Sequence, residues 1–468
     1  MTDAPANMTL MDEATATTGG QAPRLSAFSS LAEPEFAWFF AGNMAFFMAM
    51  QMQFVLRGYL AFELTNSASA LGLIAIMIAL PMLVASPFGG AIADRVNKRT
   101  LLIVTQVGAA AASLLVAVLI IGGWLEFWHL LVVSLVTGIV FSFNMPARQA
   151  LVPNLVPRHK LTNAISLQMG GMTFTQIVSP ALGGLLIAPF GAGSVYMLTA
   201  GFFIVATVSE FHLPKHGMTS QAGHGPFFAD MLGGFSYVLH HRLIRLLVAT
   251  SLLVPLLGFP VQQLLPVFAR DVFDRGPAGL GLLAGMTGVG GLIGAMVSSQ
   301  MDREPRKGRL LLIGGAITGL ALLSFAFAPR FELAMACLAA AGVGQMLFQA
   351  TNNTAIQANL APEVRARVMS VMLMSFGLMP LGVIPITAAA DAIGPQSAVA
   401  IAAGVFLVAL VTLFTLSSHL RELRLEPLAH AVLSPVRAAE LVATGELTQA
   451  QADQLSGRAE EAVLPAGG

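Results

Sequence analysis

Leu71-Gly72-Leu73-Ile74-Ala75 recurs further along the chain as Leu280-Gly281-Leu282-Leu283-Ala284, and this repetition decides the fold. A second landmark, Asn154-Leu155-Val156-Pro157, recurs as Asn359-Leu360-Ala361-Pro362, in the same order and after nearly the same number of residues. The repetition indicates a duplicated unit. Two parallel repeats related by an axis along the membrane normal are typical of secondary transporters, which bind their cargo near the midplane between the repeats.

Composition places both repeats in a membrane. The 468 residues are 56% apolar and only 10% charged, with a mean hydropathy of +0.77, whereas soluble chains carry about 25% charged residues. A spanning helix needs about 20 mostly apolar residues, and the apolar runs are too long and too uniform for barrel strands. We therefore expect an all-α membrane protein with twelve transmembrane helices in two pseudo-symmetric six-helix bundles. The expected spans are 37–61, 70–93, 100–122, 127–150, 162–189, 193–213, 243–268, 277–300, 309–328, 332–358, 366–390 and 396–416.

These spans divide the chain into two bundles with polar segments around them. The first 35 residues have no basic flank followed by an apolar stretch, so no cleaved signal peptide is expected. Cys337 is the only cysteine, which excludes an internal disulfide and a cysteine-ligated metal site. The expected division is a polar N-terminal tail (1–35), a first bundle (36–213), a cytoplasmic linker (214–242), a second bundle (243–416) and a soluble C-terminal tail (417–468).

Basic residues in the loops predict the orientation, because cytoplasmic loops carry an excess of Lys and Arg. With both termini in the cytoplasm, fourteen basic residues fall in inner loops and three in outer loops. The outer three are Arg270, Arg275 and Arg330. The inner set is Arg95, Lys98, Arg99, Arg158, Lys160, Lys215, Arg242, Arg245, Arg303, Arg306, Lys307, Arg309, Arg365 and Arg367.

The loop between spans two and three is a candidate gating loop. Its sequence is Gly89-Gly90-Ala91-Ile92-Ala93-Asp94-Arg95-Val96-Asn97-Lys98-Arg99, and Asp94-Arg95 recurs in the second repeat as Asp302-Arg303. Small residues such as Gly90 allow close helix packing, and Asp94 is favourable beside a helix N-terminus. Arg95 and Arg99 can pair with carboxylates of other inner loops in one conformation only. The alternative is that the loop carries positive-inside charge alone.

This loop resembles the signature loop of the major facilitator superfamily. The stretch from Asn144 to Pro157, with Leu161-Thr-Asn-Ala-Ile-Ser166 after it, resembles the enterobactin-exporter-like branch, as does Leu56-Arg-Gly-Tyr-Leu-Ala-Phe-Glu-Leu-Thr65. The resemblance covers about residues 35–416. It implies export of siderophores, macrolides or tetracyclines, driven by protons, from the plasma membrane or bacterial inner membrane.

The chain departs from the drug-antiporter pattern of this superfamily at two places. Ser134 stands four residues before Gly138, where those proteins carry an arginine. In Ser179-Pro180-Ala181-Leu182-Gly183-Gly184, serine replaces the usual glycine-proline. The departures weaken a residue-level assignment of proton antiport and leave the fold expectation intact.

Two polar stripes mark a candidate cargo cavity, which spans one, four, seven and ten line if the resemblance holds. Helical spacing puts each stripe on one face. The stripes are Thr137, Phe141, Asn144 and Arg148 in span four, and Gln345, Gln349, Asn352 and Asn353 in span ten. Polar side chains inside hydrocarbon are costly and face protein or a water-filled cavity, so we expect them to contact cargo. The alternative is hydrogen bonding between helices.

Spans one and seven complete the predicted cavity. Span one has Met50, Gln53 and Arg57 on one face, and span seven has Phe259 and Gln263. An arginine within a span is costly unless it is paired or reaches the headgroups.

Arg57 lies near the outer end of its span, so several roles stay open for it. It could reach the headgroups, or it could pair with an acidic cargo, with Glu63 or with Asp391. No Asp or Glu falls deep in an expected span, because Glu63, Glu210 and Asp391 all lie near span ends. A proton relay normally uses a buried carboxylate or histidine. Coupling therefore uses one of these end groups or takes another form.

Other function classes find little support. Gly288-Val-Gly-Gly-Leu-Ile-Gly294 lies inside an apolar run with no strand before it, so Gly290 and Gly294 are expected to pack helices and not to bind a dinucleotide. The sequence contains no Walker A motif, no basic patch for nucleic acid and no metal-ligand pattern. We expect no enzyme activity, no cofactor and no nucleic-acid partner.

The sequence is thus interpreted as a monomeric exporter of small amphipathic compounds, an efflux antiporter working by alternating access in the lipid bilayer. Two alternatives stay open at this point. One is an importer of a siderophore or organic anion attracted by Arg57 and Arg148. The other is a membrane sensor or scaffold that has lost transport.

Overall fold

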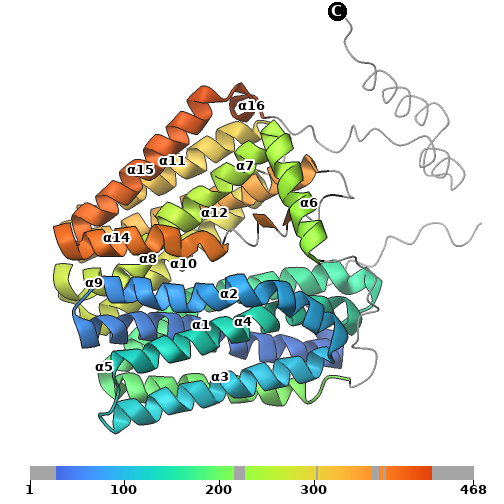
Figure 1. Cartoon of the computed structure of the whole chain (residues 1–468), viewed down its shortest axis with the longest axis vertical. Coiled ribbons are helices and arrows are strands. Elements are labelled where there is room, and N and C mark those ends of the chain that lie inside the picture. The colour runs from blue at the N-terminus through green and yellow to red at the C-terminus, as the bar shows by residue number, and fades with distance from the viewer. Residues whose placement is uncertain are drawn as a thin grey trace, which may run out of the picture.

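The computed structural model describes residues 28–214, 227–301, 304–360, 364, 368–369, 371–372 and 376–423, and only the backbone of residues 85–95, 227–232, 234 and 376. Over these residues the chain is helical and contains no strand. Nine of the described helices are long and apolar enough to cross a membrane, and two further apolar helices are shorter. Figure 1 shows α1 to α5 on one side of the molecule and α7 to α16 on the other.

The first half starts with the short η1 (Ser29–Ala32), followed by α1 (Pro34–Thr65), α2 (Ser69–Arg95), α3 (Lys98–Ile121), α4 (Phe127–Leu155), η2 (Arg158–Lys160) and α5 (Leu161–Glu210). Local sequence explains several of the helix ends. Pro34 occupies the first position of α1, where its missing N–H costs nothing. The Asn97 side chain accepts from the backbone N–H groups of Arg99 and Thr100 and so begins α3.

Gly191 divides α5 into two helical segments. Its φ of 78° and ψ of 160° are not helical, and this region of φ is open mainly to glycine. The expected spans 162–189 and 193–213 lie on the two sides of this break.

The second half begins with α6 (Phe227–His240), which lies within the expected linker 214–242. The expected seventh span is irregular. It consists of α7 (Arg242–Leu253), the π-helical η3 (Val254–Gly258), α8 (Phe259–Gln263), α9 (Leu265–Val267) and the π-helical η4 (Phe268–Val272). Pro255, Pro260 and Pro266 lie in this stretch. Each proline removes a hydrogen bond to the preceding turn, which accounts for the broken helix.

The remaining elements are α10 (Gly276–Gln300), α11 (Lys307–Ala326), α12 (Phe331–Ala358), η5 (Phe376–Leu378), α14 (Met379–Ile393), α15 (Pro395–Leu416) and α16 (Ser418–Arg421). The expected eleventh span, 366–390, is described only in part. Most of the expected tails, 1–35 and 417–468, lies outside the described residues.

Glycines allow α10 and α12 to pack backbone against backbone. A Cβ at Gly290 would overlap the carbonyl oxygen of Ala339, and one at Gly294 would lie 2.6 Å from the carbonyl oxygen of Val343. The expectation that these two glycines pack helices is confirmed. Such close approach is the usual means of holding helices together in lipid, where apolar burial supplies little driving force.

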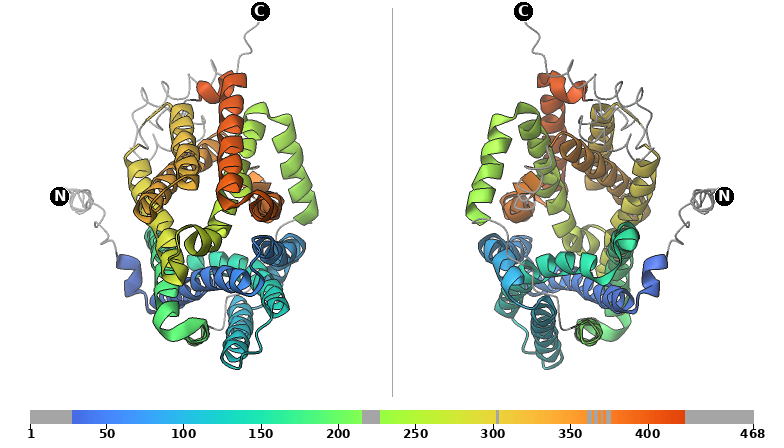
Figure 2. Two further views of the ribbon diagram at one scale, coloured as in Figure 1. Left: turned by 90° about the vertical axis from the view of Figure 1, so that its left-hand side faces the viewer. Right: turned by 90° about the vertical axis from the view of Figure 1, so that its right-hand side faces the viewer.

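The two halves meet along two seams. In the first, α5 packs on α10, where a Cβ at Gly184 would lie 2.5 Å from the Cα of Gly281. In the second, α2 packs on α14, where a Cβ at Gly72 would lie 2.6 Å from the Thr387 hydroxyl oxygen. Toward its other end, α2 also contacts η5 and α6. The views in Figure 2 show the two groups of helices on either side of the seams.

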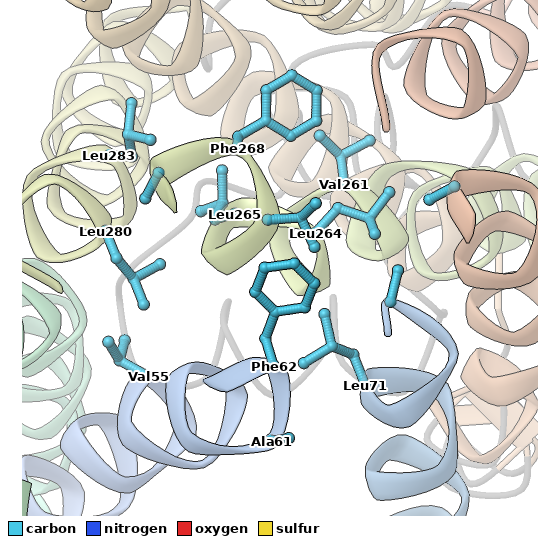
Figure 3. Close-up of a cluster of buried hydrophobic side chains, with 14 of the residues drawn as sticks. Val55, Ala61, Phe62, Leu71, Val261, Leu264, Leu265, Phe268, Leu280 and Leu283 are labelled. Carbon is cyan, nitrogen blue, oxygen red and sulfur yellow. The ribbon is translucent and has the colours of Figure 1, made fainter. Parts of the chain in front are cut away.

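Of the three largest apolar clusters, one contains side chains from both halves, and it lies at one end of the molecule. The largest cluster draws on both halves, with Phe62 and Leu71 from the first and Leu264, Phe268 and Leu280 from the second (Figure 3). Two other clusters each belong to a single half, one from Phe36 to Leu213 and one from Val238 to Leu423. We call the joined end, where α1 ends, α2 begins and α14 ends, the closed end.

The glycine packing leads to a prediction about stability. Gly290→Ala forces a methyl group against the Ala339 carbonyl, and overpacking of this kind costs roughly 1–3 kcal/mol. Gly291→Ala, one residue further along α10, meets no atom within 4 Å and serves as the matched control. We expect the thermal transition of the detergent-purified protein to fall for Gly290→Ala and to stay unchanged for Gly291→Ala. Equal transitions would contradict the described packing of α10 on α12.

Candidate functional site: a glutamine-lined cavity between the halves

A cavity of about 450 Å³ lies between the two halves. Its walls come from α1 and α5 of the first half and from α8, α9, α10 and α12 of the second. The lining residues are Gln51, Phe54, Val55, Gly58, Thr173, Gln176, Pro180, Phe259, Gln262, Gln263, Leu265, Pro266, Leu280, Ala284, Thr287, Gly288, Gly291, Gly342, Gln345, Met346 and Gln349. Its volume falls within the range of about 300–1,000 Å³ that is usual for small-molecule sites.

The cavity is polar without being charged. Six glutamines and two threonines line it, and none of the described lining residues carries a charge. Phe54, Phe259 and Met346 add aromatic and thioether surface. Each glutamine offers two N–H donors and one carbonyl acceptor, and a methionine adapts to cargo of irregular shape. The arrangement can bind a neutral or amphipathic molecule that carries several hydrogen-bonding groups.

Four of the residues proposed from sequence lie at this cavity: Phe259, Gln263, Gln345 and Gln349. All come from the second half. The sequence analysis missed the first-half lining, notably Gln51 and Gln176. The signal for α1 was present in its residues, because Gln51, Phe54, Val55 and Gly58 also follow helical spacing.

Gln53 lies on another face of α1, inside the first half. It is buried, and its amide nitrogen donates to the hydroxyls of Ser113 on α3 and Thr199 on α5. Gln53 therefore holds three helices together and does not line the cavity.

Arg57 is also buried within the first half. Its Nε donates to the backbone oxygen of Gln53 at 3.3 Å, and its Nη1 has no hydrogen-bond partner among the described residues. The two carboxylates considered as its partners are engaged elsewhere, because Glu63 lies 3.6 Å from Arg270 and Asp391 binds the start of α2. Headgroup contact does not fit a side chain that is 3% exposed.

Arg148 and Asn144 belong to a buried hydrogen-bond network and do not line the cavity, contrary to the sequence prediction. The Nε of Arg148 donates to the Asn144 side chain at 2.6 Å, and its Nη1 donates to the side chain of Asn43 on α1 at 2.8 Å. Asn144 in turn donates to the hydroxyl of Thr105 on α3 at 2.8 Å. The guanidinium also lies over the Phe46 ring, 4.2 Å from its centroid. Arg148 is 1% exposed, so it neither snorkels nor faces the cavity.

The carboxylate beside this network is Glu210. It lies at the end of α5, as expected, but it is completely buried and sits 3.6 Å from the Arg148 guanidinium. The sequence analysis found no deep carboxylate because Glu210 stands at a span end. The structure shows that α3 and α4 cover that end.

The other proposed cavity residues lie away from the lining. Met50 packs on an apolar cluster of the first half. Phe141 and Asn353 are half-buried outside the set of lining residues. Asn352, the neighbour of Asn353, donates to the backbone oxygen of Leu247 on α7 at 3.2 Å, which is helix-to-helix bonding.

Asp391 bridges the two halves at the closed end. From α14, its carboxylate accepts from the Ala68 N–H at 2.6 Å, the Ser69 N–H at 2.9 Å and the Ser67 hydroxyl at 2.7 Å. These donors lie at the N-terminus of α2, so the second half caps a helix of the first. A carboxylate at this place binds otherwise unsatisfied N–H groups and the positive end of the helix dipole.

The candidate gating loop is described only in part. Arg99 is buried, and its Nη2 donates to the backbone oxygen of Phe211 at 2.8 Å, which ties the start of α3 to the end of α5. Gly90, Asp94 and Arg95 are described by their backbone only, and Asp302 and Arg303 lie outside the described residues.

Solved structures with the same fold are membrane transporters. A bacterial homologue of the human lysosomal transporter Spinster, in an inward-facing and unoccupied conformation, superposes with a TM-score of 0.67 at 15% identity, over 84% of this chain and 98% of that chain. The nucleoside transporter NupG gives a TM-score of 0.65 at 13% identity, over 81% of this chain and 98% of that chain. Together with the apolar helices, these likenesses define an integral membrane transporter fold.

Residues 25–444 match the transmembrane secretion effector family, and the chain belongs to this family of the major facilitator superfamily. The staphyloferrin A transporter of Staphylococcus aureus is 23% identical over 397 residues, 84% of this chain and 99% of that protein. Macrolide efflux protein A of Streptococcus pyogenes is 26% identical over 340 residues, 71% and 83% of the two chains. The enterobactin exporter EntS of Salmonella choleraesuis is 27% identical over 291 residues, 60% and 67% of the two chains. The resemblance to the enterobactin-exporter-like branch is confirmed, and these relatives are transporters and not enzymes.

The two faces of α1 give a test of the cavity. In a Cys337→Ser background, Gln51→Cys should react rapidly with a water-soluble maleimide in the purified protein, because residue 51 lines the cavity. Gln53→Cys should react slowly, because a buried thiol is inert. Mass spectrometry of the labelled protein measures both rates. Faster labelling at residue 53 than at residue 51 would place the cavity on the other face of α1.

Proposed function

We propose that this chain exports small amphipathic compounds, in the drug and siderophore size range, by alternating access across the plasma membrane. The observation that carries the proposal is the uncharged, glutamine-lined cavity between two halves that share their largest apolar cluster at one end. Relatives named for macrolide efflux and enterobactin export support the direction of transport.

The chemistry of the cavity selects among cargo classes. A polycarboxylate would lose its hydration in the cavity without meeting a cation, and burying an unpaired charge is costly. A neutral or weakly basic compound with hydroxyl, lactone or amide groups would exchange water for glutamine amides at little cost. The cargo class that fits is therefore an amphipathic compound with many neutral polar groups.

Alternating access is supported by where the halves touch. The large apolar cluster and the Asp391 contacts lie at the closed end, and the other two large clusters belong to one half each. Breaking the closed-end contacts and forming new ones at the opposite end would expose the cavity to the other side of the membrane, by rocking one half against the other.

For the architecture, we propose twelve spans in two six-helix bundles, 36–213 and 243–416, joined by the linker 214–242. The excess of basic residues in the expected inner loops supports cytoplasmic termini and a closed end that faces outward. We further propose that the carrier acts as a monomer. A proton gradient is proposed as the driving force for two reasons. The sequence contains no Walker A motif for nucleotide binding, and the resemblance to the superfamily implies proton-driven efflux.

The anion importer and the sensor find less support. Arg57 and Arg148, which would attract an anion, lie inside the first half and not at the cavity. A scaffold would not need a cavity lined by six glutamines.

Cargo export is tested by accumulation in cells with and without the chain. The panel is erythromycin, tetracycline, enterobactin and the polycarboxylate staphyloferrin A. We expect lower accumulation of the neutral or weakly basic compounds and an unchanged level of the polycarboxylate. Equal accumulation of every compound in the two strains would contradict the proposal.

One variant pair refines this test. Gln349→Ala removes a cavity amide, and the loss of one hydrogen bond, about 0.5–1.5 kcal/mol, changes affinity up to roughly tenfold. The ranking of compounds should therefore change. Gln357→Ala, an exposed glutamine two turns further along α12, should leave the ranking as it is.

The Asp391 contacts lead to a prediction about the equilibrium between the conformation with a joined closed end and one in which that end is open. Asp391→Ala removes three hydrogen bonds across the closed end, and capping interactions are worth about 0.5–2 kcal/mol, or roughly two- to thirtyfold in an equilibrium. The reporter is Thr387→Cys in a Cys337→Ser background, since residue 387 is 1% exposed and faces α2. An impermeant maleimide added outside cells should label it faster when Asp391 is replaced.

Glu332→Ala is the control for this experiment, because Glu332 is an exposed carboxylate in the first turn of α12. Its labelling rate should equal that of the parent. An unchanged rate for Asp391→Ala, at equal expression, would mean that these contacts do not hold the closed end.

A further inference from the structure

Glu210 is a buried carboxylate that the cargo cavity does not use. It is the last residue of α5, and its side chain is 0% exposed. One carboxylate oxygen, Oε1, lies 3.6 Å from Nη2 of Arg148 on α4 and accepts a hydrogen bond from Nε2 of Gln106 on α3 at 3.3 Å. Three helices of the first half therefore meet at this group.

We infer that Glu210 is the proton-binding site of this carrier, with Arg148 as the counter-ion that transmits its charge state to the surrounding helices. The inference rests on the proposed proton-driven export and names the residue that export would use. Uptake forms one O–H bond on the carboxylate with a proton from water on one side of the membrane. Release returns that proton to water on the other side.

The ionised group is incompletely satisfied. Each of the three side chains keeps one buried polar atom without a hydrogen bond among the described residues: Oε2 of Glu210, Nη2 of Arg148 and Oε1 of Gln106. Buried polar atoms normally find a partner. A tight ion pair closes to about 2.7–2.9 Å, whereas this pair stands at 3.6 Å. Asn144, Asn43 and the Phe46 ring hold the guanidinium from its other sides.

The protonated group has partners of its own. A protonated carboxyl donates one hydrogen bond, and the amide oxygen of Gln106 is an acceptor without a partner on a side chain already in contact. Rotation of that amide would present the oxygen to the carboxyl. The ionised form is stabilised by Arg148 and the protonated form by Gln106. A group that must both take up and release a proton needs such an alternative set of partners.

The charge of Glu210 acts on the cavity through Arg148. Protonation leaves the guanidinium without a counter-charge in a buried position, which is strongly unfavourable. Arg148 binds Asn43 of α1, the helix that carries Gln51 to the cavity wall. Through Asn144 it also reaches Thr105 of α3. Movement of Arg148 would therefore shift α1 relative to the cargo.

The neighbouring charges are few. Arg148 from α4 and Arg99 from α3 face Glu210, and α1 contributes the neutral Asn43 to the same network. His212 follows on the same chain, is exposed, and stacks on Trp38 of α1 with ring centroids 4.0 Å apart. The carboxylate thus lies within one helical turn of residues that reach the surface, which gives its proton a short way to water.

The experiment uses the full chain in liposomes, with Glu210→Gln as the test variant. Glu33→Gln is the control, because Glu33 forms a partly exposed ion pair with Lys160 in the same half. The first readout needs no cargo. Infrared difference spectra between alkaline and acidic pH should show the C=O band of a protonated buried carboxyl in the parent and in Glu33→Gln. That band should be absent from Glu210→Gln.

The second readout uses radiolabelled erythromycin. Accumulation driven by a pH gradient should fall by about tenfold or more in Glu210→Gln relative to the parent and to Glu33→Gln, since the coupling free energy is lost. Glu210→Asp keeps a carboxyl and should retain accumulation with a shifted pH profile. A Glu210→Gln variant that keeps the infrared band, or accumulates erythromycin like the parent, would overturn the inference.

The two proposals fail in different ways. If the parent protein moves no erythromycin but shows a band that Glu210→Gln lacks, the export proposal loses its support and the proton site stands. If the parent accumulates erythromycin under a pH gradient and Glu210→Gln does so equally, export stands and Glu210 is a structural ion-pair partner only.

Discussion

Inside a lipid bilayer every polar group of a protein must find its partner within the protein or in a water-filled cavity, because hydrocarbon offers none. The polar side chains of this chain are sorted by that constraint. Among the charged side chains, Arg148 and Glu210 are enclosed in the first half, where they face each other and contact neighbouring amides. Six neutral glutamines line the cavity between the halves, whereas Gln53 and Gln106 form hydrogen bonds inside the first half. The proton site and the cargo site that we propose are therefore separate from each other.

The cavity and the contacts between the halves share residues. Pro180 and Leu280 line the cavity, and they belong to α5 and α10, the helices that meet at Gly184 and Gly281. A bound molecule would therefore touch the same surfaces that must separate when the closed end opens. Backbone-to-backbone contact at the glycines leaves no side chain to adjust, so the seam has either its packed geometry or an open one.

Hydropathy was sufficient to predict a helical chain with several apolar helices of membrane-spanning length, because each run has to cover the thickness of a bilayer whatever it packs against. It was not sufficient to predict which face of a helix meets the cargo. Gln51 and Gln53 are two residues apart on α1, and both belong to plausible polar stripes. Their roles are decided by Ser113 and Thr199, which accept from Gln53 and are distant in sequence.

The burial of a residue at a span end was equally hard to predict from sequence. Glu210 stands at a span end, and only the packing of α3 and α4 over it makes it inaccessible. Prolines account for the breaks in the seventh span, yet the two π-helical turns depend on how the chain recovers its hydrogen bonds after each proline. Of the predicted stripe on α12, Gln345 and Gln349 lie at the cavity, whereas Asn352 donates to Leu247 of α7 and Asn353 lies outside the lining.

The capping of α2 by Asp391 has a consequence for the carrier without cargo. The first turn of α2 is completed by a residue from the other half. Under the alternating access that we propose, separation of the halves would leave three donors to bind water, so the carrier without cargo would favour the conformation with its closed end joined. With the orientation proposed above, a carrier without cargo would open its cavity to the cytoplasm and remain closed on its outer side. The membrane would then remain impermeable at the carrier until a compound binds from the cytoplasm.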